Sequence, residues 1–315
     1  MVELPDGLAS CVPAFVDPAA EKTDEDLAER ARSFLSATPR PFLKWAGSKR
    51  WLLPHLVPLL PRTFRTYREP FLGSGALFFL LQPKRAVLGD MCGELVQTFE
   101  AVRDNPAAML RYVHPLKPNE ETFYTIRTKR SAGRFQRAAE FIYLNKTCWN
   151  GLYRVNSSGV FNVPYGKPSA DGIVDDENLR ACAQVLAQPG VQLRTSDFAS
   201  LLVDTQEGDL VYLDPPYVTG HSNNGFIDYN EKLFAWEDQH RLAKAAADLD
   251  RRGAHVIVTN ADHADVIKLY SGFEIVAVER WSTLAGDVAR RRTVREVIIH
   301  NLNRSRAAER NGNGH

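Results

Sequence analysis

The chain has 315 residues, of which 44% are hydrophobic, and a formal net charge of +1. It is long enough for one large globular domain or two modest ones with a substantial core. No run of 18 apolar residues occurs, which excludes a membrane-spanning helix, and the acidic N-terminus does not resemble a signal peptide. We therefore expect a cytoplasmic protein.

Residues 1–40 form an acidic N-terminal extension. Between Met1 and Thr38 there are three basic and eight acidic residues, a balance of −5, and apolar periodicity is poor. One amphipathic helix is predicted over residues 24–35, and the rest is expected to be peripheral. At the other end, residues 303–315 are polar and rich in Gly and Asn, which is typical of a disordered tail.

From residue 41 onward, short apolar runs alternate with helical patterns. Helices are predicted over residues 76–81, 94–103, 236–251 and 263–270. Runs suited to strands buried on both faces are residues 66–71, 85–89, 191–195, 210–213 and 255–259. Residues 273–281 and 294–301 are predicted as a final, antiparallel strand pair at the edge. This alternation favours an α/β fold with a doubly wound, mainly parallel sheet.

Residues 115–189 interrupt this alternation. They contain a helical segment over residues 123–144 and a hairpin-like segment over residues 150–166, as expected for an inserted domain. Nine basic and three acidic residues lie between Pro115 and Lys167, a balance of +6, and eight and three lie between Arg280 and Arg310, a balance of +5. Two basic stretches on a nearly neutral chain favour a surface that faces phosphates, with a solvated charged face as the alternative.

The four cysteines, Cys11, Cys92, Cys148 and Cys182, are widely spaced and include no C-x-x-C pair. This spacing predicts neither a metal site nor a disulfide framework. We expect most of them to be buried as small apolar side chains.

A glycine-rich turn follows the first predicted strand, in Glu69-Pro70-Phe71-Leu72-Gly73-Ser74-Gly75. Two glycines let the backbone approach a nucleoside-like ligand closely, whereas Phe78 is too bulky for a pyrophosphate crossing. Asp90, at the end of the second predicted strand, is placed to accept hydrogen bonds from ribose hydroxyls. The alternatives are a plain structural turn for the glycines and a helix N-cap for Asp90.

The most specific signal is Leu210-Val211-Tyr212-Leu213-Asp214-Pro215-Pro216-Tyr217. An apolar strand delivers an acid, then two prolines that cannot continue a sheet ladder, then an aromatic ring. This array suits an aromatic amine, because the Asp214 carboxylate and the Pro215 carbonyl accept N–H bonds while Tyr217 offers a ring for stacking. A structural Asp-Pro turn is the alternative.

These motifs resemble the Dam-type DNA adenine N6-methyltransferases, a family of alpha-group amino-methyltransferases. The resemblance runs from about residue 41 to residue 301 and rests on four ordered motifs. They are the glycine-rich turn, Asp214 to Tyr217, a match of residues 43–49 to L-K-W-A-G-G-K, and a match of residues 145–166 to the family's hairpin pattern.

The resemblance implies a fold, a cofactor, a substrate and site residues. It implies a seven-stranded methyltransferase-type sheet with an inserted helical target-recognition domain, S-adenosyl-L-methionine as methyl donor without a metal, and double-stranded DNA as partner of a monomeric enzyme. The implied catalytic residues are Asp214, Pro215 and Tyr217. The implied cofactor-binding residues are Trp45, Lys49, Phe71, Gly73, Gly75, Asp90 and Asp214. The implied DNA-binding residues are Lys44, Asn150, Leu152 and Arg154.

The hairpin residues also make chemical sense on DNA. Trp149 and Leu152 offer apolar wedges and Arg154 is able to read guanine, although a hydrophobic hairpin core is the alternative for the two apolar residues. Three departures from the family pattern concern the DNA contacts more than the chemistry. Ser48 replaces a glycine, which requires a negative φ, Lys146-Thr147-Cys148 replaces the commoner Arg-x-Gly, and residues 284–292 match poorly.

We therefore predict an N-terminal extension (residues 1–40), a catalytic domain in two parts (41–114 and 191–302), an inserted target-recognition domain (115–190) and a tail (303–315). The predicted activity is site-specific methylation of adenine N6 in DNA, with GATC as the family-level target. Cytosine N4 methylation, methylation of a protein glutamine and a non-catalytic DNA-binding regulator are the alternatives. The sequence leaves open whether the enzyme serves restriction-modification, strand marking or a phage.

Overall fold

The computed structural model describes residues 1–9, 39–45, 47–156, 158–168, 172–217, 234–281 and 293–302. A seven-stranded sheet with the order β5-β4-β3-β6-β7-β9-β8 forms its centre. The strands are β3 (Tyr67–Glu69), β4 (Arg85–Asp90), β5 (Gly190–Thr195), β6 (Leu210–Leu213), β7 (His255–Ala261), β8 (Glu274–Trp281) and β9 (Thr293–His300). Neighbouring strands pair in parallel except at β9, which runs antiparallel to both β7 and β8. The predicted α/β class, the mainly parallel sheet and the antiparallel final pair are confirmed.

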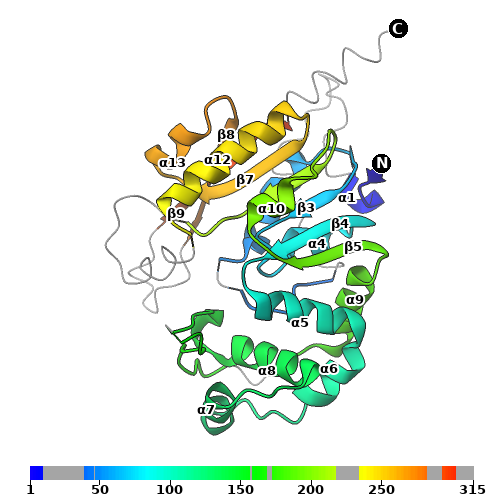
Figure 1. Cartoon of the computed structure of the whole chain (residues 1–315), viewed down its shortest axis with the longest axis vertical. Coiled ribbons are helices and arrows are strands. Elements are labelled where there is room, and N and C mark those ends of the chain that lie inside the picture. Colours follow the sequence, from blue (N-terminus) through cyan, green and yellow to red (C-terminus); the bar gives the residue numbers. More distant parts are fainter. Residues whose placement is uncertain are drawn as a thin grey trace.

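Helices cover both faces of the sheet (Figure 1). On one face lie α4 (Ala76–Leu81), α5 (Gly93–Asp104) and α9 (Asp176–Leu186), and on the other α10 (Phe198–Leu202), α12 (Trp236–Arg251) and α13 (Ala264–Leu269). Strand β6 shows why its apolar run is continuous: Leu210 and Tyr212 enter one core cluster, while Val211 and Leu213 enter the other. A strand covered on both faces has no solvent side on which to carry polar residues.

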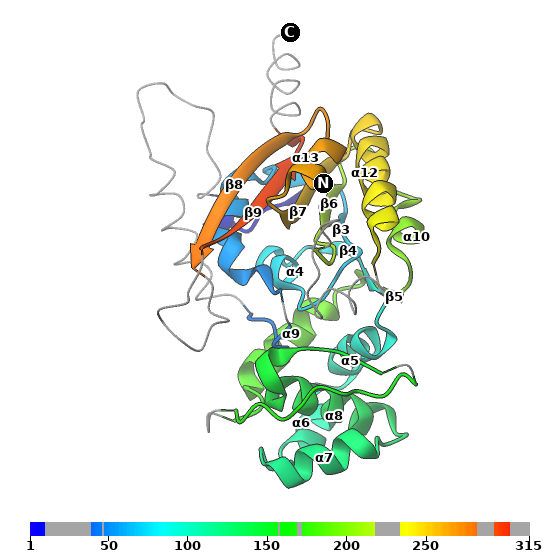
Figure 2. The same ribbon diagram turned by 90° about the vertical axis from the view of Figure 1, so that its left-hand side faces the viewer.

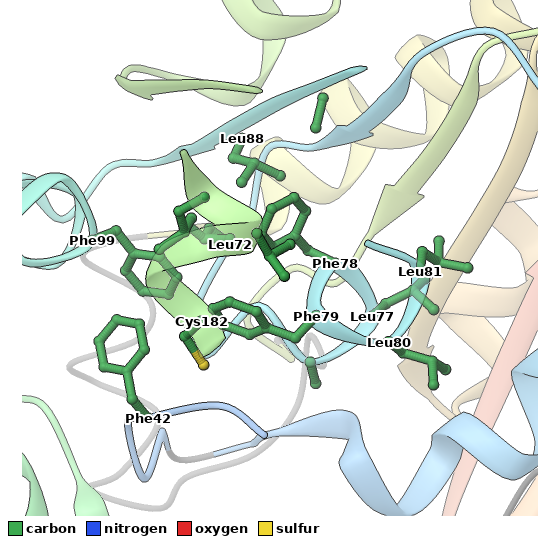
Figure 3. Packing of buried hydrophobic residues seen from close by; sticks show 14 of the residues in the cluster. Phe42, Leu72, Leu77, Phe78, Phe79, Leu80, Leu81, Leu88, Phe99 and Cys182 are labelled. Carbon is green, nitrogen blue, oxygen red and sulfur yellow. The ribbon is translucent and has the colours of Figure 1, made fainter. Parts of the chain in front are cut away.

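Helix α4 is buried on every side, and all six of its residues are apolar. Figure 3 shows its leucines and phenylalanines packed with Leu88 of β4, Phe99 of α5 and Cys182 of α9. The ring of Phe42 contacts that of Phe99 at a centroid distance of 4.7 Å. A short helix without a polar face is stable only inside such a core.

The described cysteines are free thiols. Cys148 and Cys182 are buried, as predicted, whereas Cys92 is half-buried. Burial raises the pKa of Cys148 and of Cys182 to about 12. Both therefore remain protonated at neutral pH and pack as small apolar groups.

A helical part lies below the sheet in Figures 1 and 2 and consists mainly of α6 (Pro106–Val113), α7 (Glu120–Thr128) and α8 (Arg134–Thr147). The predicted helical segment over residues 123–144 thus comprises parts of two helices, α7 and α8, and the side chain of Asn119 caps the first. After α8 comes the turn η3 (Trp149–Gly151), followed by isolated bridges that pair Cys148 with Tyr165 and Val155 with Phe161. This segment is hairpin-like without a continuous ladder.

Helix α9 belongs to the predicted insertion by sequence but packs on α5 of the sheet layer. Its Leu179, Cys182 and Leu186 are buried in the main core cluster. The helical part therefore shares buried surface with the sheet layer, and the division into two domains remains a prediction.

The first nine residues differ from the expected peripheral extension. Strand β1 (Val2–Glu3) pairs with β2 (Thr63–Phe64). Leu4, and Leu8 of the short helix α1 (Asp6–Ala9), are buried in the core. Apolar side chains only four residues apart were too weak a periodic signal for a core element. The predicted helix over residues 24–35 and residues 284–292 lie outside the described residues, as does the tail from residue 303.

Short helical turns complete the fold between residues 49 and 59. They are η1 (Lys49–Leu52), α3 (Leu53–Leu56) and η2 (Val57–Leu59). Among the described helices, none is long and apolar enough to cross a membrane.

Candidate active site

Three signals from distant parts of the sequence meet at one edge of the sheet. The strands β3, β4 and β6 are parallel neighbours, so their carboxyl ends lie together. The glycine-rich turn follows β3, Asp90 ends β4 and Asp214 follows β6. In open parallel sheets, ligands bind at this edge, where the strand order reverses.

The glycine-rich turn and Asp90 are joined directly. The amide of Gly73 donates to Oδ2 of Asp90 at 3.1 Å, and the amide of Cys92 donates to Oδ1 at 2.9 Å. Helix α5 has Cys92 as its N-cap and no side-chain capping bond, so Asp90 is not its N-cap. Burial raises the pKa of Asp90 despite these amide bonds. The carboxyl group thus closes the turn and keeps lone pairs for further donors.

The indole of Trp45 lies against the same turn. Gly73 has φ +47°, and a Cβ there would lie 2.9 Å from Cδ1 of Trp45. Glycine is required because the backbone takes a left-handed conformation and the ring leaves no space. The Trp45 ring also stacks on Tyr153 at a centroid distance of 5.6 Å and an interplanar angle of 21°. Three of the residues predicted to bind the cofactor, Trp45, Gly73 and Asp90, therefore lie in contact as one group.

Phe71 and Gly75 flank this group in different ways. Gly75, with φ +66°, is the N-cap of α4 and starts the helix after the turn. The half-buried ring of Phe71 stacks on Phe198 at 5.4 Å and meets Phe234 edge-on at 5.7 Å. Phe198 was not singled out from the sequence, although it follows strand β5 just as the glycine-rich turn follows β3.

Asp214 is held by two donors at a single oxygen. Oδ1 lies 3.2 Å from Nζ of Lys49 and accepts a 2.7 Å hydrogen bond from the hydroxyl of Thr259 on β7. Lys49 also donates to the Gly47 carbonyl at 2.9 Å. Burial raises the pKa of Asp214, while Lys49 and Thr259 oppose this rise and the charge of Glu296 adds to it.

The ring of Tyr217 lies beside this carboxylate. Nζ of Lys49 is 4.3 Å from the ring centroid, and the Tyr217 hydroxyl donates to Oε2 of Glu296 at 2.7 Å. Lys49 is 3.7 Å from the same Oε2. Burial raises the pKa of Tyr217 well above its usual value, with the nearby charges of Asp214 and Glu296 adding to the effect. The phenol is therefore a neutral donor, and the site combines a cation, two acids and an aromatic face.

Two residues of this group were missed from the sequence, Thr259 and Glu296. A sequence signal for Glu296 was present, since this acid directly precedes the apolar run Val297-Ile298-Ile299 of a predicted strand. A charged side chain in a buried strand needs a partner, which identifies it as a candidate for a polar site. Thr259, at the end of a β-branched run, carried no comparable signal.

Ser48 joins the N-terminal motif to the glycine-rich turn. Its hydroxyl lies 3.0 Å from that of Ser74. Its φ is −49°, so the negative value that the replacement of glycine requires is present. The substitution therefore leaves the path of the chain toward Lys49 unstrained.

The predicted DNA-binding residues lie on the hairpin-like segment and on the chain beside it. Lys44 is exposed and its backbone is tied to α8 by Asn145, whose Oδ1 accepts from the Lys44 amide at 2.7 Å. Asn145 Nδ2 also donates to the carbonyls of Lys44 and Gly151, at 3.1 and 3.3 Å. One buried amide therefore holds the Lys44 segment against the start of the hairpin.

The side chains of the hairpin differ in exposure. Asn150 and Arg154 are exposed, and Arg154 Nε donates to Asn162 at 2.8 Å. Trp149 is 45% exposed, whereas Leu152 is partly buried against the cluster around Phe123. Trp149 is thus exposed, whereas Leu152 packs partly against this cluster and keeps part of its side chain exposed.

The chain matches known proteins along most of its length. Residues 45–284 match the family described as D12 class N6 adenine-specific DNA methyltransferase. The chain is 35% identical to the Type II methyltransferase M1.LlaDCHI of Lactococcus lactis subsp. cremoris, an alignment that covers 83% of this chain and 95% of that protein. It is 34% identical to the Type II methyltransferase M.MjaIII of Methanocaldococcus jannaschii, over 83% and 99% of the two chains. It is 30% identical to the DNA adenine methylase of Haemophilus influenzae, over 82% and 92%.

Proposed function

The chain belongs to the D12 class of N6 adenine-specific DNA methyltransferases, and on this premise we propose which residues carry the reaction. Asp214, Pro215 and Tyr217 hold an adenine that has left the double helix while its N6 amine receives a methyl group. The observation that carries the proposal is the arrangement at Asp214. Lys49 and Thr259 both bind its Oδ1, and within the described residues no hydrogen bond or ion pair is made by Oδ2.

The methyl donor of this class is S-adenosyl-L-methionine, which supplies an electrophilic methyl group on a sulfonium centre. The group around Gly73 fits such a ligand. Asp90 has lone pairs for ribose hydroxyls, the Trp45 ring offers an aromatic face, and the backbone of Gly73 allows close approach. We assign cofactor binding to these residues with Phe71, Gly75 and Lys49.

Asp214 acts as an acceptor that orients the amine. A hydrogen bond from N6–H to its Oδ2, with the Pro215 carbonyl as second acceptor, turns the nitrogen lone pair toward the methyl group. As the N–C bond forms, positive charge develops on nitrogen, and a fixed carboxylate lowers the energy of that state. The Tyr217 ring supports the face of the base. The bond between the methyl group and sulfur would break as the N–C bond forms, leaving a neutral thioether. One N6 proton would then pass to solvent and leave a neutral N6-methylamino group.

The target adenine must leave the stack, because N6 inside a duplex cannot meet a buried carboxylate. We propose that Lys44, Asn150, Leu152 and Arg154 engage the DNA, with the exposed Trp149 as a wedge between base steps. The hydrogen bond of Arg154 to Asn162 uses Nε, so the two terminal nitrogens of the guanidinium are not engaged by Asn162. They can donate to two acceptors on the edge of a guanine. GATC is the target that we propose.

The alternative functions have less support. Cytosine N4 methylation would use the same acceptors, but the matched family is adenine-specific. A non-catalytic regulator would have no need for the buried contacts of Asp214 with Lys49 and Thr259. Nucleoside analysis of the product separates all of these functions.

The first test is transfer of a labelled methyl group to unmethylated double-stranded DNA, followed by nucleoside mass spectrometry. Asp214→Asn keeps the size of the side chain and removes its charge, so we expect a rate loss of roughly 10²–10³-fold. Binding of S-adenosyl-L-methionine should persist, because Asp90 and Gly73 are unchanged. Asp248→Asn, on the exposed face of α12, is the matched control and should retain the wild-type rate. Label in N4-methylcytosine, or full activity of Asp214→Asn, would contradict the proposal.

A further inference from the structure

Glu296 is a buried acid, 3% exposed, on the antiparallel strand β9. Its neighbours Val297 and Ile299 enter the core cluster beneath α12, while Ile298 enters the cluster on the opposite face. Successive side chains of a strand alternate between faces, so Glu296 points to the same side as Ile298. This is the side that carries η1, and with it Lys49.

The register of the sheet brings this carboxylate to the catalytic edge. Glu296 pairs with Ala261, the last residue of β7, and Thr259, which binds Asp214, is two residues earlier on that strand. Because β7 is the parallel neighbour of β6, its end lies beside Asp214 and Tyr217. Glu296 therefore approaches the site from the strand that runs against the others.

Oε2 of Glu296 contacts both the tyrosine and the lysine of the site. Oε2 of Glu296 accepts from the Tyr217 hydroxyl at 2.7 Å and lies 3.7 Å from Nζ of Lys49. The same Lys49 is 3.2 Å from Asp214 and 4.3 Å from the Tyr217 ring centroid. A ring fixed at its far end by a buried acceptor, with a cation against it, has little freedom to rotate or tilt.

We propose that Glu296 is a positioning residue that fixes the ring of Tyr217 in the orientation needed to support the extrahelical base. It does so through the hydrogen bond from the Tyr217 hydroxyl, and it shares Lys49 with Asp214. This inference rests on the proposed function, because it assigns Tyr217 to the base. Glu296 itself does not touch the reacting atoms.

The test is a double-mutant cycle on the rate of a single turnover, at saturating S-adenosyl-L-methionine and saturating unmethylated double-stranded DNA. Glu296→Ala should slow transfer about tenfold or more, and Glu296→Gln, which keeps an acceptor for the hydroxyl, should recover part of the loss. In a Tyr217→Phe background, where the hydroxyl is already gone, Glu296→Ala should cost less than about threefold. The affinity for S-adenosyl-L-methionine, measured by calorimetry, should change by less than about threefold throughout.

Val297→Ala is the matched control. It removes buried atoms from the same strand on the opposite face, so it reports the effect of a weakened β9 alone. At a temperature where all variants are folded by circular dichroism, its rate should equal that of the wild type. Tyr217→Phe removes the hydrogen bond between Tyr217 and Glu296 and leaves the buried acid in place. It therefore tests the role of this hydrogen bond even if the Glu296 variants do not fold.

Several results would overturn the inference. Equal costs of Glu296→Ala in the two backgrounds would show that it does not act through Tyr217, and a Tyr217→Phe rate within about twofold of wild type would remove the link itself. A loss of cofactor affinity as large as the loss of rate would place Glu296 in the cofactor site instead. A wild-type protein that binds S-adenosyl-L-methionine but labels no adenine would overturn the proposed function, and this inference with it.

Discussion

The acid Asp214 shows how a single residue is tuned by its surroundings. Burial alone disfavours its charged form, whereas the ammonium group of Lys49 and the hydroxyl of Thr259 stabilise that form. Burial is the largest effect and raises the pKa of Asp214. On acidification, Asp214 is therefore protonated at a higher pH than an exposed aspartate, and the carboxylate that the reaction needs is lost at that higher pH.

This environment gives a pH prediction. Transfer should require ionised Asp214, so the single-turnover rate should fall on the acid side at a pH above the usual aspartate pKa of about 3.9. A raised pKa in the folded state means that the fold takes up this proton before the unfolded chain does. The group thus stabilises the fold at low pH, and that contribution is lost as pH rises through the raised pKa. Inactivation by this group should precede acid unfolding.

The measurement is the transfer rate against pH at saturating cofactor and DNA, with circular dichroism at each pH. Asp90 also has a raised pKa, so cofactor affinity must be measured in parallel. A rate that stays constant until the protein unfolds would contradict the prediction.

At the scale of elements, the hairpin-like segment depends on the side chain of Asn145 in α8. Its amide makes three hydrogen bonds, to the Lys44 amide, the Lys44 carbonyl and the Gly151 carbonyl, and it is 2% exposed. Gly151 has φ +65°, so the chain turns sharply at the point that this amide holds. The proposed DNA contacts therefore share one structural anchor.

Asn145→Ala should remove that anchor. With three buried hydrogen bonds lost and their partners unsatisfied, the free energy of unfolding should fall by about 2–4 kcal/mol. At temperatures where the variant is folded, affinity for double-stranded DNA should drop while affinity for S-adenosyl-L-methionine is kept, as measured by fluorescence anisotropy and calorimetry. Asn105→Ala, which removes the N-cap of α6 in the same helical part, is the control and should leave DNA affinity unchanged. Equal DNA affinity for the two variants would contradict the proposal that Asn145 anchors the DNA-binding residues.

At the scale of the whole molecule, a buried ion pair fixes the middle of the sheet at the end opposite the site. Arg68 of β3 donates through Nε to Asp209, just before β6, at 2.8 Å. It also donates to the carbonyls of Leu201 and Asp204, at 3.1 and 2.9 Å. One guanidinium thus joins β3, the end of α10 and the start of β6.

Arg68→Ala should leave the Asp209 charge buried without its partner, which typically costs about 3–5 kcal/mol of stability. Urea unfolding should show this loss, while the rate per folded molecule stays at the wild-type level because the pair is remote from Asp214. Arg251→Ala, whose ion pair on α12 is exposed, should cost about 1 kcal/mol or less. An equal cost for the two variants would show that the buried pair has no special role in holding the sheet.

Much of this fold was determined by the sequence itself. The strands β4, β6 and β7 and the helix α12 were predictable, because a buried parallel strand is a continuous apolar run and an amphipathic helix repeats every 3.6 residues. The glycine-rich turn and Asp214-Pro215-Pro216-Tyr217 were predictable too, since glycine and proline restrict the backbone locally. Each of these patterns lies within a few neighbouring residues, so it can be recognised in the sequence without knowledge of the tertiary structure.

Only the tertiary structure decided which of these residues meet. Lys49, the Asp214–Tyr217 motif and Glu296 come from three separate segments, and the order of the strands brings them together. The packing of Leu4 and Leu8 on the core and of α9 on α5 was likewise undetermined by local pattern. The physical reason is that a local pattern predicts only that a side chain is buried. Which residue it contacts depends on the order and register of the strands, and these depend on the whole chain.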